Sequence, residues 1–173
     1  MALPPLDATP GGPSSNSFVT VARAIDLQTG RTGAATFAAL PQADQEALLM
    51  RATQDISLTV HWYGAPVDPL QALPLPMLGQ VDGMGRLLPT DIIPPLVEQA
   101  TALYALVLMS SGGDVTISSA AIEHLRKGDT EVWYHGSVQT AIAGGTLPLE
   151  IWTYLRPYGQ VPQRGRQAPV FRG

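Results

Sequence analysis

The stretch ALLMRATQDISLTVHWYG, residues 47–64, decides how this chain folds. Its apolar residues recur with the helical period of about 3.6 residues and form one stripe: Leu48, Leu49, Ala52, Ile56 and Val60. Pro41 opens the pattern, and Gly64 with Pro66 closes it, which predicts a long helix over about residues 42–62. Such a helix needs another apolar surface to cover its stripe.

A second apolar segment supplies that surface. It starts at Pro94 or Pro95, where a missing N–H is tolerated, and it runs to about Met109 with almost no polar face. A helix that is apolar nearly all round lies at the centre of a bundle. We therefore expect it to pack against the Leu49 and Ile56 side of the long helix.

Shorter helices surround this pair. Thr20 is a suitable N-cap for a helix over about residues 21–28, and a helical turn is expected around residues 36–40. A last helix is expected over about residues 148–155. Its apolar face is formed by Leu149, Trp152 and Leu155.

The segments between the helices carry turn signals. Residues 65–90 contain five prolines and three glycines, which predicts a long loop with extended pieces. Residues 122–126 and 131–134 flank the turn Lys127-Gly128-Asp129, which predicts a β-hairpin. Because a two-stranded hairpin is marginal by itself in water, this one is expected to lie against a partner surface.

Both ends of the chain have the composition of tails. Residues 1–16 hold four prolines, two glycines and two serines, and such segments bury too little apolar surface to fold alone. We expect neighbouring chains to hold both ends; the alternative is that the tails fold back on their own domain. The expected fold is mainly α. It is a small helical bundle over residues 17–157 with a hairpin near residues 122–134, an extended N-terminal arm over residues 1–16 and an extended C-terminal tail over residues 158–173.

The composition points to assembly. Only 14% of the 173 residues are charged, against roughly 25% in an average soluble protein, so we expect partners to cover part of the surface. The net charge of −4 and the single lysine, Lys127, argue against a broad phosphate-binding surface. The longest apolar stretch, residues 96–109, is shorter than the roughly 20 residues that span a bilayer, and we expect no membrane partner.

The search for catalytic motifs finds none that is complete. His61, His124 and His135 lack the helix spacing of a zinc site. The glycine-rich residues 79–85 lack the third glycine and the preceding strand of a dinucleotide-binding loop. Asp91 is interpreted as a helix-entry cap in preference to a catalytic carboxylate. We therefore expect no enzymatic activity, no cofactor and no bound metal.

Two features invite a nucleic-acid interpretation. Trp62 and Trp152 have the chemistry to stack on bases, but at helix ends with apolar neighbours they are more often core or interface anchors. The C-terminal tail has three arginines and no acidic residue, together with proline and spaced apolar residues, which suits an extended peptide that docks on a partner protein. Docking on protein is favoured over contact with DNA. The tail residues expected to bind the partner are Arg164, Arg166, Pro169, Val170, Phe171 and Arg172.

Several short motifs follow one another over residues 16–110. They are Ser17-Phe18-Val19, Ala47-Leu48, Arg51-Ala52-Thr53, Trp62-x-Gly64 and Pro89-x-Asp91-Ile92-x-Pro94. Their order resembles the head–tail connector proteins of tailed bacteriophages, also called adaptor or head completion proteins. The segment from Lys127 to Tyr134 and the later Leu155-Arg156-Pro157-Tyr158 look like the closing hairpin and last helix of that family. Some members are labelled DnaT-like single-strand DNA-binding proteins.

The resemblance implies a helical protomer repeated in a ring, typically of about twelve copies, that joins the portal protein to a tail terminator or stopper protein. Genomic DNA would pass through the lumen without sequence-specific binding, and the C-terminal tail would reach the portal. The protein would be assembled in the host cytoplasm and would reside in the neck of the virion. The alternative function is a single-strand DNA-binding accessory protein of replication, although the interleaved basic and aromatic residues of such proteins are missing.

Overall fold

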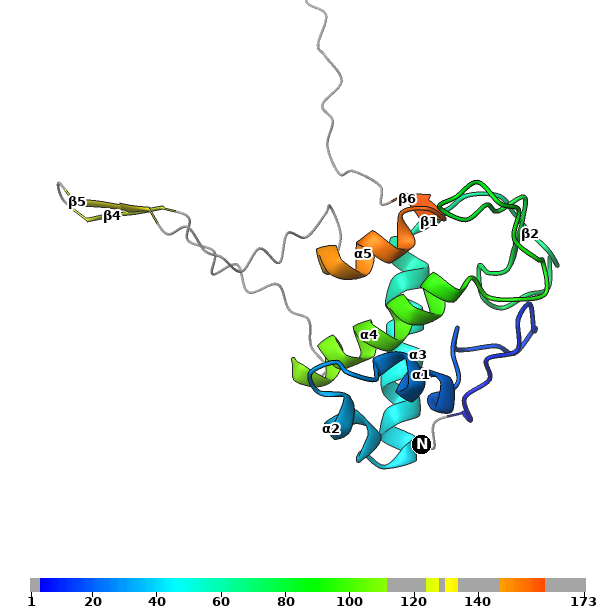
Figure 1. Ribbon diagram of the computed structural model, residues 1–173, viewed down its shortest axis with the longest axis horizontal. Helices are drawn as coiled ribbons and strands as arrows, with labels where there is room; N and C mark the ends of the chain where they lie inside the picture. Colours follow the sequence, from blue (N-terminus) through cyan, green and yellow to red (C-terminus); the bar gives the residue numbers. More distant parts are fainter. Residues whose placement is uncertain (1–3, 112–123, 128–129, 134–146, 161–173) are drawn as a thin grey trace, which may run out of the picture.

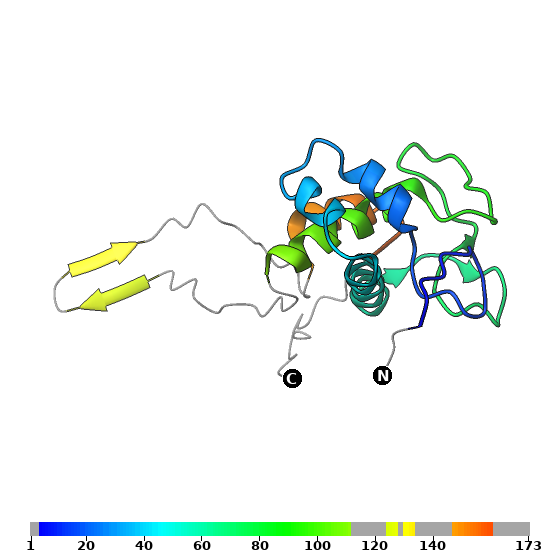
Figure 2. The ribbon, with the colours of Figure 1, turned by 90° about the horizontal axis from the view of Figure 1, so that it is seen from below.

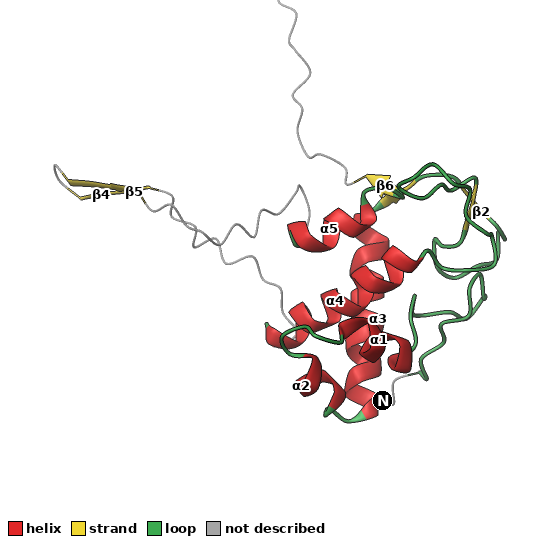
Figure 3. Cartoon of the chain, viewed as in Figure 1, coloured by secondary structure: helices red, strands yellow, loops and turns green. Residues whose placement is uncertain are grey.

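The computed structural model describes residues 4–111, 124–127, 130–133 and 147–160. In this part of the chain the fold is mainly α, as expected. It consists of five helices and three small antiparallel sheets of two strands each (Figures 1 and 3). The helices are α1 (Val21–Gln28), α2 (Ala34–Ala38), α3 (Gln42–Thr59), α4 (Pro95–Ser110) and α5 (Leu149–Leu155). The strands are β1 (His61–Trp62), β2 (Ala65–Pro66), β3 (Met77–Leu78), β4 (His124–Lys127), β5 (Thr130–Trp133) and β6 (Gly159–Gln160).

The centre of the bundle is the contact between α3 and α4, which is the most extensive contact between two described elements. On α3 the side chains of Leu49, Ala52 and Ile56 are fully buried, and α4 is buried on nearly every side from Val97 onward. Leu48, at the edge of the stripe, is only half-buried. The expected packing of the two apolar helices is confirmed.

α1 lies against α4 and has the expected bounds. The Thr20 hydroxyl oxygen accepts the backbone N–H of Arg23 at 3.3 Å, which confirms the N-cap. At the other end, Gln28 is buried and its Nε2 donates to the carbonyl of Ala102 at 2.7 Å. This hydrogen bond ties the last turn of α1 to the middle of α4.

α3 is shorter than expected and ends at Thr59. The next residues form β1, which pairs antiparallel with β6 and places Trp62 opposite Gly159. Trp62 is buried and its ring lies edge-on to that of Phe18, with centroids 6.1 Å apart. Trp62 is therefore a core anchor. Its backbone pairs with β6 in place of continuing α3.

The same strand pair places Tyr158, Gly159 and Gln160 in the body, although their composition assigned them to the C-terminal tail. Tyr158 is buried, and a Cβ on Gly159 would lie 2.7 Å from the carbonyl oxygen of His61. Only glycine permits so close an approach of the two strands.

The apolar face predicted for α5 is partly wrong. Leu155 is buried and Trp152 is half-buried, but Leu149 is 44% exposed and Ile151 is buried instead. Ile151 and Leu155 are four residues apart, so they lie on one side of the helix, and α5 packs with that side on α4.

The cap predicted at Asp91 is wrong. The residue before the first turn of α4 is Pro94, no side chain caps this helix, and Asp91 is exposed three residues earlier. Pro95 has no N–H to satisfy, and the N–H groups of Val97 and Glu98 bond to the Pro94 carbonyl at 2.8 and 3.2 Å. A proline entry thus replaces a capping carboxylate.

The long loop between β1 and α4 has extended pieces, as expected. β2 pairs antiparallel with β3, and a single bridge joins Val81 to Leu87. Gly64 begins this loop with φ +108°, and a Cβ there would lie 2.5 Å from the carbonyl oxygen of Leu78.

The N-terminal arm has neither helix nor strand in residues 4–17, and contacts within the chain hold it. The Asn16 side chain accepts the N–H of Asp7 at 2.8 Å and donates to the Pro5 carbonyl at 2.9 Å. The N–H of Ala72 donates to the Gly12 carbonyl at 3.1 Å, so the arm lies beside the long loop (Figure 2). At this end the alternative applies, in which the tail folds back on its own domain.

The hairpin expected near residues 122–134 is confirmed. β4 and β5 pair antiparallel, with His124 opposite Trp133 and Lys127 opposite Thr130. The glycine-containing turn between them lies outside the described residues.

Candidate interaction surfaces

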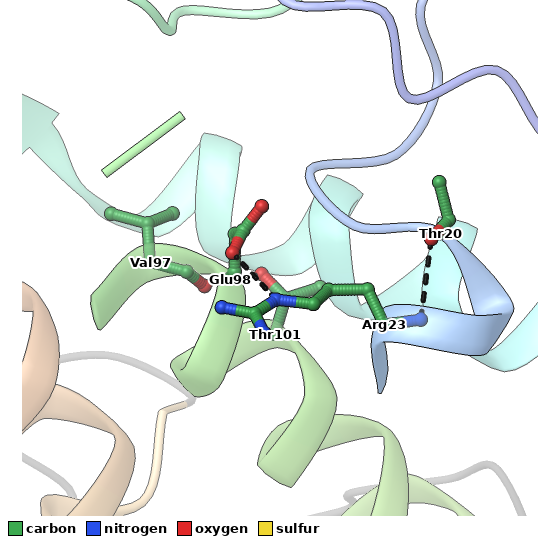
Figure 4. A network of polar contacts seen from close by, with 5 residues as sticks. All are labelled: Thr20, Arg23, Val97, Glu98 and Thr101. Atoms are coloured by element: carbon green, nitrogen blue, oxygen red, sulfur yellow. Dashed lines mark hydrogen bonds and ion pairs between the residues drawn. The ribbon is translucent and has the colours of Figure 1, made fainter. Parts of the chain in front are cut away.

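The helices are joined at their surface by ion pairs. Arg23 reaches from α1 to Glu98 on α4, with Nε and Oε2 3.2 Å apart, beside the Thr20 cap (Figure 4). Arg31 contacts Glu150 on α5 at 3.0 Å and also donates to the hydroxyl of Tyr154 at 3.1 Å. These two arginines connect the N-terminal helical region to α4 and α5.

Two more arginines form ion pairs within a single element. Arg51 contacts Asp55 on α3 at 3.1 Å, as expected from their spacing of four residues, and Arg86 contacts Asp82 in the long loop at 2.7 Å. Within residues 4–111 and 147–160, four of the five arginines are thus paired with a carboxylate. The fifth, Arg156, is exposed.

The charge balance of this body is acidic. Residues 4–111 and 147–160 contain ten aspartates and glutamates against those five arginines. A surface that holds phosphates needs a cluster of cationic side chains that are free to contact them. Because most of the guanidinium groups already contact carboxylates, this part of the chain does not form such a cluster.

Two of the ionisable groups with shifted pKa values, Asp82 and Tyr104, serve local structure. The backbone N–H of Arg86 holds the pKa of Asp82 below its usual value, and the Arg86 side chain adds to the effect. Burial raises the pKa of Tyr104 to about 12, and the neighbouring Asp55, which accepts its hydroxyl at 3.4 Å, adds to the effect. One group shapes a loop, and the other joins α4 to α3.

Exposed apolar side chains gather in the long loop. Ten large apolar side chains are exposed in the described chain, and eight of them lie within residues 63–92. This segment is on the side of the molecule away from α2 (Figure 1). We call these eight residues the apolar loop surface: Tyr63, Val67, Leu70, Leu78, Val81, Met84, Leu87 and Ile92.

Hydrogen bonds fix the backbone beneath the apolar loop surface. The Asp82 carboxylate accepts the N–H groups of Met84 and Arg86 at 2.8 and 2.9 Å. Gln71 donates through Nε2 to the carbonyls of Leu73 and Pro76 at 2.7 and 3.2 Å. The loop therefore presents its apolar side chains from a defined scaffold, which is what a binding surface requires.

Sequence reasoning identified this segment as a loop and did not identify it as a surface. Prolines and glycines dominate its composition and predict turns. The signal that was available is the set of large apolar residues placed between those turns, since a loop exposed to water is usually polar.

The tail residues expected to bind a partner all lie outside the described residues. They are Arg164, Arg166, Pro169, Val170, Phe171 and Arg172. His61 is exposed, and in the described part of the chain no group of three metal-ligating side chains comes together. No helix among the described residues has the length and apolar character needed to cross a membrane.

Comparison with curated proteins and with solved structures found no match. One family model matches residues 6–173, and its description is "Putative DnaT-like ssDNA binding protein". The match includes the helical bundle, the hairpin and the C-terminal tail, so it spans most of the chain. The chain therefore belongs to this DnaT-like family.

Proposed function

We propose that this protein is a structural adaptor of a bacteriophage neck, in which copies form a ring that joins the portal protein to a tail terminator or stopper. The observation that carries the proposal is the apolar loop surface: eight exposed apolar side chains on one ordered segment. When so many exposed large apolar side chains lie in one segment, they mark a surface that a partner covers. The motif order that resembles phage connectors supplies the identity of the assembly.

The charge distribution supports a role in which DNA passes without being held. Residues 4–111 and 147–160 carry ten acidic side chains against five arginines, and this net negative charge would disfavour a tight hold on the phosphates of DNA in a channel. We propose no catalytic step, no cofactor and no membrane contact. In this account the protein assembles in the host cytoplasm and resides at the head–tail junction of the virion.

Mass measurement of the full chain, alone and mixed with the portal protein of the same phage, tests the adaptor function. We expect a defined complex in which a ring of this chain is bound to the portal, visible as a ring in electron micrographs. A protein that remains separate from the portal at all concentrations, with or without a stopper, would contradict it.

A second candidate is a single-strand DNA-binding accessory protein, and the description of the matching family favours it. Its largest cluster of candidate cationic residues is the tail arginines Arg164, Arg166 and Arg172, because four of the five arginines of the body are paired with carboxylates. A gel shift with an oligonucleotide of single-stranded DNA at moderate salt separates the candidates. Micromolar binding that survives that salt and is lost on changing the three arginines to alanine would favour DNA binding over the adaptor.

A further inference from the structure

We propose that the apolar loop surface of one copy binds the C-terminal segment of the next copy, residues 161–173. The inference rests on the proposed ring, because it names the contact that would join its subunits. It differs from the expectation that the tail reaches the portal. The chemistry of the surface, the chemistry of the segment and the direction of β6 support it.

The surface is apolar with a net negative charge. Met84, Leu70 and Leu87 are 78%, 76% and 73% exposed. Among the charged residues of the same loop, Asp82 is paired with Arg86, whereas Asp68 and Asp91 make no ion pair with the described residues. A ligand that complements this surface has apolar side chains and positive charge.

The segment VPQRGRQAPVFRG, residues 161–173, has that chemistry. It carries three arginines and no acidic side chain, with Val161, Val170 and Phe171 as apolar residues. Pro162 and Pro169 favour an extended backbone, which lowers the entropy lost on binding. Fully extended, a segment of this length spans roughly 43 Å, at about 3.3 Å per residue.

The direction of β6 favours a neighbouring copy over the same copy. In the antiparallel pair, Gly159 lies opposite Trp62 and Gln160 lies opposite His61. β1 runs from His61 to Trp62 and then into the apolar loop surface, so β6 runs in the opposite sense and leaves the pair beside His61. β6 therefore points away from the loop of its own chain where it ends at Gln160. This direction favours a head-to-tail contact with the next copy, and repetition of such a contact closes a ring where its rotation brings the last copy back to the first.

Complementation between two variants of the full-length chain tests this contact. The surface variant carries Met84→Glu and Leu87→Glu, and the tail variant carries Val170→Asp and Phe171→Asp. Each loses one half of the contact and keeps the other. We expect each variant alone to self-associate at least about tenfold more weakly than the unaltered chain in sedimentation equilibrium, since two apolar side chains leave the interface. A mixture of the two should form a one-to-one pair, because one supplies an intact tail and the other an intact surface.

Leu149→Glu is the matched control, because Leu149 is exposed but lies outside the apolar loop surface. It should leave self-association unchanged, and circular dichroism should show all variants folded. A mixture of folded variants that fails to pair overturns the inference, as does a full-length chain that stays monomeric at every accessible concentration. If both variants still form rings on the portal, the proposed contact is wrong and the adaptor function stands. If the unaltered chain does not bind the portal, the adaptor function itself is wrong.

Discussion

The α3–α4 core and the apolar loop surface are adjacent regions of one chain, and both are rich in large apolar residues. In the core, Leu49, Ile56 and Val97 are fully covered by residues of the same chain. In the loop, Leu70, Met84 and Leu87 are mostly exposed, on a backbone that hydrogen bonds hold in place. The comparison shows that apolar composition alone does not distinguish residues that stabilise the fold from residues available to bind a partner. What separates them is whether the chain itself can cover the side chain.

Truncation of one side chain in each region should produce the largest contrast. Ile56→Ala removes a fully buried side chain from the α3–α4 contact and is expected to lower the free energy of unfolding by about 2–5 kcal/mol. Leu70→Ala removes a side chain that is mostly exposed and should change it by no more than about 0.5 kcal/mol. Urea unfolding of both variants measures the two values, and equal losses would contradict the division into core and surface.

The start of the loop should be nearly as sensitive as the core. Gly64 has φ +108° and a Cβ there would lie 2.5 Å from the Leu78 carbonyl oxygen, so Gly64→Ala is expected to cost about 1–3 kcal/mol of stability. Gly83→Ala is the control, because no heavy atom lies within 4 Å of a Cβ at that position. Thermal unfolding of the two variants compares them. If Gly64→Ala is as stable as Gly83→Ala, the close approach of β2 and β3 is not required.

Two buried threonines allow a hydrogen bond between distant segments to be compared with a hydrogen bond inside one helix. Thr53 Oγ1 accepts the N–H of Phe18 at 3.1 Å, so Thr53→Val leaves a buried N–H without its partner and should cost about 1–3 kcal/mol. Thr101 Oγ1 donates only to the carbonyl of Val97 in its own helix, at 2.9 Å, so Thr101→Val should cost less. Denaturant titrations that rank the two in the reverse order would show that the Phe18 contact contributes little.

The ion pairs should have the smallest effect. A double-mutant cycle on Arg23 and Glu98, which join α1 to α4, is expected to give a coupling of about 0.2–1 kcal/mol, because both side chains are partly exposed. The coupling should fall as salt is added. The same cycle on Arg86 and Asp82 tests whether an ion pair within the long loop has a similar coupling energy. For either pair, a coupling energy that does not change with salt would contradict its assignment as a surface ion pair.

The sequence was sufficient to predict the bundle, because α3 and α4 carry strong apolar periodicity and prolines or glycines at their ends. It was insufficient where two distant segments meet. β1 and β6 are separated by almost a hundred residues, and the glycine at position 159 shows its role only once His61 lies against it. The prediction of a cap at Asp91 was wrong because α4 starts with Pro95, which has no backbone N–H for a side chain to cap.

The apolar loop surface could be read from the sequence only as a loop, since its prolines predict turns and do not tell which side chains face water. Burial decides that, and burial follows from the tertiary structure. The tail residues from Arg164 to Arg172 were chosen for their composition, and the described residues do not include them.

Hydroxyl-radical footprinting of Met84 tests most directly whether the apolar loop surface is covered in the assembly. Met84 is 78% exposed in the single chain, so it should be modified rapidly in dilute protein. Our account predicts strong protection of Met84 once the full-length chain has assembled on the portal. Equal modification of Met84 in the dilute and the assembled protein would contradict it.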